Sequence, residues 1–70
     1  MRAFYSTQKN FRVFILGTPD GWQVFIYDLR KHEWVSTNGR MKETLQIAKS
    51  AAQDQTSLLL GKKIQEMRWH

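Results

Sequence analysis

The stretch FRVFILGTPDGWQVFIYDL, residues 11–29, decides the fold because it combines two apolar runs with a strong turn signal. In TPDG, proline suits the second turn position and glycine accepts a positive φ. This pattern favours a β-hairpin with a three-residue loop, Pro19 to Gly21, closed by a glycine bulge. Thr18 then faces Trp22 across the strands. The same register pairs Leu16 with Val24, Phe14 with Ile26, and Arg12 with Asp28.

Both faces of this predicted hairpin are apolar, whereas a small sheet usually buries one face and wets the other. The register assigns Arg12, Phe14, Leu16, Trp22, Val24, Ile26 and Asp28 to one face, and Phe11, Val13, Ile15, Phe25, Tyr27 and Leu29 to the other. A single helix can cover one face. We expect the second to be covered by the chain termini, by a second copy of the chain, by another protein, or by unpaired bases stacked on its aromatic rings.

The rest of the chain predicts one more strand and one helix. EWVST, residues 33–37, is aromatic and β-branched, and the following NG, residues 38–39, ends it. A helix capped by Asn38 or Gly39 should begin near Arg40 and stop at Gly61, with residues 58–60 as its last buried turn. The sequence therefore predicts a single α+β domain over residues 1–70, a three-stranded antiparallel sheet in the order β-β-β-α with one helix on one face. Residues 1–9 and 62–70 are expected as flexible or docking arms, with a fourth C-terminal strand as an alternative.

Composition excludes several classes of protein. The chain has 70 residues, no cysteine and two histidines, His32 and His70, so we expect neither disulfides nor a metal site. Its longest apolar runs, residues 13–16 and 24–27, are far shorter than the roughly 20 residues that span a bilayer. The N-terminus lacks the apolar region of a signal peptide, and a cytoplasmic protein without membrane contact is expected.

No motif in the sequence indicates catalysis or a cofactor. The serines lie in no nucleophile motif, HE at residues 32–33 lacks the second histidine of a zinc motif, and there is no Gly-rich phosphate loop. We therefore expect a non-enzymatic binding module that forms a homodimer, with no cofactor and no catalytic residue.

The net charge of +5, from 11 Lys and Arg against 6 Asp and Glu, favours a nucleic acid or a nucleoprotein complex as the partner. The alternative is a protein-interaction or inhibitory module that uses an apolar sheet face, as a homodimer or with another protein. A short basic chain of this kind also suits a phage or mobile-element protein. Candidate phosphate contacts are Arg30, Lys31, Arg40, Lys42, Lys62 and Lys63; candidate interface residues are Phe11, Val13, Ile15, Phe25, Tyr27 and Trp34.

Residues 22–54, with WQVFIYDLRKHEWVS before an alanine-rich helix, resemble in topology the DNA-binding domains of plant ethylene-response factors and the arm-binding modules of integrases. In those families a basic, exposed three-stranded sheet reads the major groove. The strand positions here are apolar where those families carry Arg and Trp toward bases. The resemblance therefore extends to the topology and to no residue role.

Overall fold

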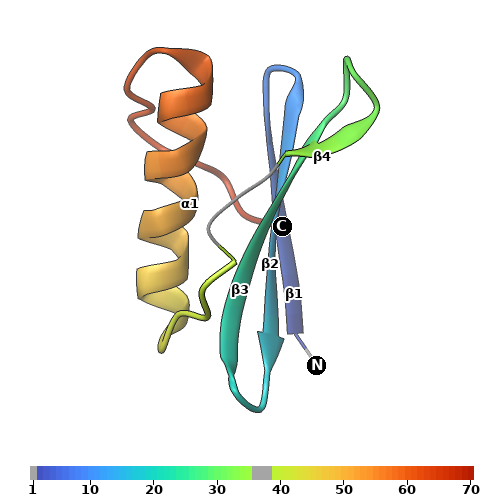
Figure 1. The fold of residues 1–70 in the computed structure, drawn as a ribbon. Helices are drawn as coiled ribbons and strands as arrows, with labels where there is room; N and C mark the ends of the chain where they lie inside the picture. The colour runs from blue at the N-terminus through green and yellow to red at the C-terminus, as the bar shows by residue number, and fades with distance from the viewer. Residues whose placement is uncertain (1, 36–38) are drawn as a thin grey trace.

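The computed structural model describes residues 2–35 and 39–70. It is an α+β fold, as the sequence predicts: a four-stranded antiparallel sheet in chain order, packed on one helix (Figure 1). The elements are β1 (Arg2–Gln8), β2 (Phe11–Thr18), β3 (Gly21–Asp28), β4 (Glu33–Val35) and α1 (Leu45–Leu60). The fourth strand is N-terminal, because residues 2–8, expected as an arm, pair with residues 11–17 of β2.

The register between β2 and β3 differs by one residue from the predicted one. Thr18 pairs with Gly21, so the turn is the two-residue Pro19–Asp20 without the expected bulge. The Thr18 hydroxyl donates to the Gly21 carbonyl at 3.1 Å and accepts from the Asp20 N–H at 3.2 Å, which closes the tighter turn. The expected pairing of Arg12 with Asp28 is therefore wrong.

Trp22 supplies the physical reason for this register. In the observed pairing its partner is Gly17, and a Cβ on Gly17 would lie 2.6 Å from the Trp22 ring. The indole can pack this closely over β2 because that position has no side chain. The predicted register would have placed Thr18 opposite the ring instead.

A one-residue shift moves every side chain of β3 to the other face of the sheet relative to β2. Val13 and Ile15 therefore share a face with Val24 and Ile26 rather than with Phe25 and Tyr27. This face is the core face. Its buried apolar residues, together with those of the helix and tail, are Phe11, Val13, Ile15, Val24, Ile26, Ala48, Ala52, Ile64 and Met67.

Helix α1 begins later than predicted. Trp22 and Lys42 exchange backbone hydrogen bonds of 2.8 and 2.7 Å, which hold the chain against β3 up to Lys42. The N-cap is Thr44, whose hydroxyl accepts from the Ile47 N–H at 3.1 Å. Gly39 is therefore not the cap, and Asn38, like the expected strand residues Ser36 and Thr37, lies outside the described residues.

The far end of α1 confirms the predicted stop at Gly61, which adopts φ 71° as a left-handed C-cap. The expectation of a buried last turn is wrong, since Leu58 is 83% exposed. The helix buries Ala48, Ala52 and Thr56. These are small side chains, which let the helix lie close to the sheet.

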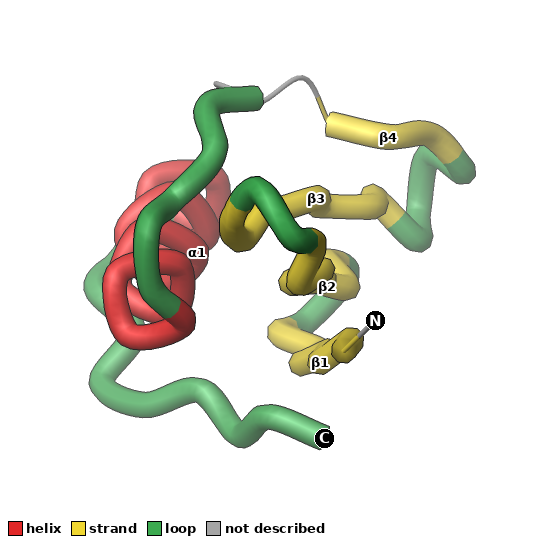
Figure 2. The backbone as a smooth tube through the Cα atoms, turned by 90° about the horizontal axis from the view of Figure 1, so that it is seen from below, coloured by secondary structure: helices red, strands yellow, loops and turns green. Residues whose placement is uncertain are grey.

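The C-terminal tail, residues 62–70, closes the core beside the helix and then reaches β1. Ile64 and Met67 are buried in the core, and Trp69 packs against it. Tyr5 and His70 exchange backbone hydrogen bonds of 3.0 and 2.9 Å at the outer edge of β1. The tail thus packs against the domain on the helix side of the sheet (Figure 2).

We expect Gly17→Ala to lower the free energy of unfolding by about 1–3 kcal/mol, because the new methyl group must displace the Trp22 ring. Chemical denaturation measures the loss. In a Trp22→Leu background the same substitution should cost much less. An equal cost in both backgrounds would contradict the assignment of the register to this contact.

Asp28 joins the two turns at one end of the sheet, and its ionisation should make stability depend on pH. Its Oδ1 accepts from the N–H of Lys31 at 3.1 Å, from the N–H of Arg30 at 2.9 Å and from Asn10 Nδ2 at 3.2 Å. The hydrogen bond from Lys31 is the largest of the effects that lower the pKa of Asp28, and partial desolvation opposes them.

Because the folded pKa lies below the unfolded value of roughly 3.9, ionised Asp28 stabilises the fold above that pH. The stabilisation should be lost as the pH falls through the folded pKa. Asp28→Asn, whose amide oxygen can still accept from the turn, should show a flatter dependence of unfolding free energy on pH below 5 or so. A slope equal to that of the wild type would show that Asp28 is not the group responsible.

Candidate nucleic-acid interface

One face of the sheet is not packed against α1, and we call it the open face. Within residues 2–35 and 39–70, no helix or strand lies over this face. The edge strand β4, next to β3, bends away from α1 (Figure 2). The pairing of the strands places these side chains on it: Tyr5, Arg12, Phe14, Leu16, Gln23, Phe25, Tyr27 and Trp34. One of the two apolar faces of the sheet is thus left without a cover by the described part of the chain.

Trp34 is the centre of an aromatic cluster on the open face. Its ring lies 5.0 Å from that of Tyr27 and 6.2 Å from that of Phe25, both edge-on, and 5.7 Å from that of Phe14. Phe14 belongs to β2, which is not a neighbour of β4 in the sheet. Trp34 therefore leans inward across β3, and it remains 60% exposed. We call these four residues the aromatic cluster.

A hollow of about 480 Å³ lies beside Trp34. Its lining is almost entirely apolar and comes from Leu16, Phe25, Ile26, Trp34 and Val35. An apolar hollow beside an exposed indole offers a planar ring both a stacking surface and a place to exclude water.

At the β1 side of the open face, a cation lies over an aromatic ring. The Arg12 guanidinium is 5.6 Å from the centre of the Tyr5 ring, and its Nε donates to the Thr7 hydroxyl at 3.1 Å. The Tyr5 ring lies 5.4 Å from that of His70. Sequence reasoning missed Tyr5 and Arg12 as site residues because it expected an arm at residues 1–9 and a salt pair for Arg12. The two aromatic residues and the β-branched threonine of FYST could have indicated the strand.

The predicted interface residues divide between the two faces. Phe25, Tyr27 and Trp34 lie on the open face, in the aromatic cluster. Phe11, Val13 and Ile15 are buried beneath α1, so their assignment to an accessible interface is corrected. The shifted register explains the division, because the prediction placed β3 one residue away from its observed partners on β2.

The predicted phosphate contacts do not form one cluster. Arg30 and Lys31 lie in the β3–β4 turn, at the end of the molecule where Figure 1 also shows the β1–β2 turn and the end of α1. Arg40 and Lys42 lie near the opposite end of β3, where Lys42 pairs with Trp22. Because the N-cap is Thr44 and the helix begins at Leu45, this pair does not lie in the first turn of α1.

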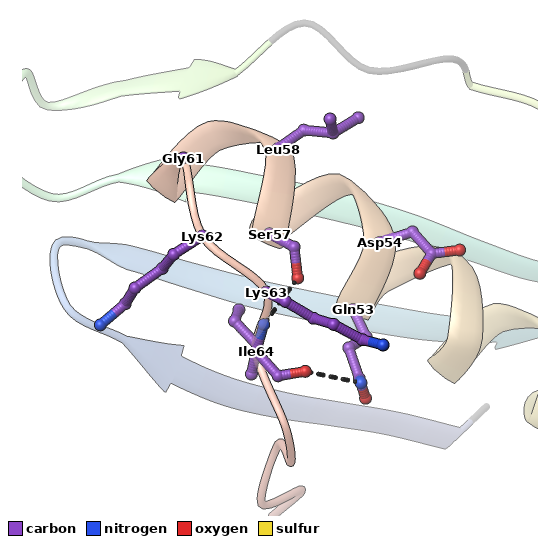
Figure 3. A pocket seen from close by; sticks show the side chains of 8 residues that line it. All are labelled: Gln53, Asp54, Ser57, Leu58, Gly61, Lys62, Lys63 and Ile64. Carbon is purple, nitrogen blue, oxygen red and sulfur yellow. Dashed lines mark hydrogen bonds between the residues drawn. The ribbon is translucent and has the colours of Figure 1, made fainter.

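Lys62 and Lys63 line a pocket of about 530 Å³ at the end of α1, on the helix side of the sheet. Figure 3 shows their side chains extending in different directions. The polar groups between them tie the tail to the helix: Gln53 Nε2 donates to the Ile64 carbonyl at 2.9 Å, and the Ile64 N–H donates to Ser57 Oγ at 3.0 Å. The geometry is that of a structural junction with two lysines at its rim.

Among residues 2–35 and 39–70, no three His, Asp or Glu side chains gather closely enough to hold a metal ion. In the same part of the chain, no helix has the length and apolar character that crossing a bilayer requires.

No protein-family model, no curated protein and no solved structure matches this chain. The function must therefore be argued from the open face itself.

Proposed function

We propose that this protein binds single-stranded nucleic acid, with unpaired bases stacked on the open face, and that it acts by binding rather than by catalysis. The observation that supports this most directly is the aromatic cluster around the exposed Trp34, on a sheet face that no helix or strand of the described residues covers. RNA-binding sheets of four antiparallel strands use exposed aromatic rings in this way.

The chemistry of the cluster fits unpaired bases better than a duplex. Stacking of a base on an aromatic side chain contributes about 1–3 kcal/mol and tolerates any base, because every base has a π-face. In a duplex those faces are already stacked on one another. The apolar hollow beside Trp34 adds a place where one such ring can be held.

Charge supports the same partner. The net charge of +5 attracts a polyanion over long range. Arg12 lies on the open face itself, and the exposed Arg30 and Lys31 lie in the turn that leads into β4. These three residues are the proposed local phosphate contacts. Arg40, Lys42, Lys62 and Lys63 are assigned to the long-range attraction. Such a binder would act in the cytoplasm, the location that the sequence predicts.

We expect Trp34→Ala to weaken binding of a fluorescent oligouridylate or oligothymidylate about 5- to 150-fold, as the loss of one stacked base implies. Fluorescence anisotropy at low salt measures the affinity. Leu58→Ala, which truncates an exposed apolar side chain on the helix, is the matched control and should change little. A duplex of the same length should bind more weakly than the single strand.

A comparison of two variants with the same loss of charge tests where the oligonucleotide binds. Arg30→Gln with Lys31→Gln should weaken binding more than Lys62→Gln with Lys63→Gln, although both pairs remove two charges. Equal effects would indicate net charge alone. If the wild-type protein binds neither oligonucleotide even at low salt, the proposed function is wrong.

A second candidate is a homodimer formed through the open face. The observation that favours it is the exposed apolar surface around Trp34, which is 60% exposed and which a second copy of the same face could cover. Sedimentation should then give twice the chain mass, and Phe25→Asp or Tyr27→Asp should return the monomer mass. A wild-type monomer at high concentration would exclude this candidate.

A further inference from the structure

A second hollow, of about 490 Å³, lies where the tail meets the end of β1. The tail reaches this place because Met67 is buried in the core and His70 pairs with Tyr5. We call it the β1–tail hollow. Its lining comes from two segments at opposite ends of the chain and from β2: Tyr5, Ser6, Thr7, Gln8, Arg12, Glu66, Arg68 and His70.

The lining of the β1–tail hollow is rich in hydrogen-bond donors. Arg12 uses its Nε for the Thr7 hydroxyl, which leaves the outer N–H groups of its guanidinium for another acceptor. Arg68 adds a second guanidinium from the tail, and Gln8 adds an amide. Guanidinium groups bind phosphate oxygens in a bidentate manner, which makes a pair of arginines a suitable phosphate site. Glu66, on the same lining, opposes an anion.

The hollow is continuous with the aromatic cluster. Tyr5 and Arg12 belong both to the open face and to the lining of the hollow. Tyr5 pairs with Phe14 across the strands, and the Phe14 ring lies 5.7 Å from that of Trp34. A path from Trp34 over Phe14 to Tyr5 therefore crosses the sheet from β4 to β1 and ends at the two guanidiniums.

We propose that the β1–tail hollow binds a backbone phosphate of the single strand whose bases stack on the aromatic cluster, with Arg12 and Arg68 as its ligands. This inference rests on the proposed function. It adds a defined end point to the path of the nucleic acid across the open face. It assigns a role to Arg68, which no sequence pattern distinguishes from the other ten lysines and arginines. It also makes Glu66 a group that limits affinity.

The test uses two charge changes of opposite sign at the hollow and their matches at the pocket shown in Figure 3. Arg68→Gln should weaken oligouridylate binding roughly tenfold, as loss of a charged hydrogen bond implies, and should reduce the slope of log affinity against log salt by about one. Lys62→Gln removes the same charge at the other pocket and should have a clearly smaller effect.

Glu66→Gln should tighten binding, and Asp54→Asn, its match at the pocket of Figure 3, should tighten it less. All four side chains are exposed, so each variant should keep the wild-type thermal unfolding curve. If each variant at the hollow equals its match, the hollow is not a phosphate site, whereas sensitivity to Trp34→Ala would still support stacking.

If the wild-type protein binds no oligonucleotide, an NMR titration with inorganic phosphate tests separately whether the hollow binds an anion. Shifts of the backbone amide signals of Thr7 and Arg68, lost in Arg68→Gln, would support an anion site that does not depend on the proposed function. No shift at these residues would overturn the inference. A backbone phosphate needs no free end. An oligonucleotide without a terminal phosphate should therefore bind as tightly as the same oligonucleotide with one.

Discussion

The packing of the Trp22 ring over Gly17 is the contact on which the rest of the structure depends, because it accompanies the register that divides the sheet into its two faces. With Gly17 opposite Trp22, the β-branched aliphatic side chains of β2 and β3 lie on the core face, and the rings of Phe14, Phe25 and Tyr27 lie on the open face. A shift of one residue would mix the two sets. Lys42, paired with Trp22, then fixes where the chain can turn into α1.

The helix and the tail together cover the core face of the sheet. Ala48 and Ala52 let α1 lie close to the strands, but such small side chains fill little volume. Ile64 and Met67 supply the remaining apolar surface from the tail. A domain of this size has little core to spare, so the tail is part of the fold rather than an appendage. Since the helix and the tail both lie on the core face, Trp34 on the open face remains exposed.

The open face combines aromatic rings with positive charge, and the two together indicate a nucleic-acid partner more specifically than either property does alone. Exposed aromatic rings suit proteins as well as bases, and an excess of lysine and arginine is common in proteins that bind no nucleic acid. Their arrangement is more informative. Arg12 lies over Tyr5, next to the aromatic cluster, and the tail brings Arg68 to the same edge. By contrast, Lys62 and Lys63 lie at a junction on the helix side.

The sequence by itself determined the α+β class, the hairpin at residues 11–29, the helix stop at Gly61 and the presence of apolar residues on both faces, because these follow from periodicity and from turn chemistry within short segments. It did not determine the register, since turns of two and three residues both fit TPDG and the choice involves the ring of Trp22. Nor could it determine that residues 2–8 pair with β2 or that Arg12 and Arg68 line one hollow. The second placement depends on contacts between residues far apart in the chain, and it exists only once the tail has packed against the sheet and helix.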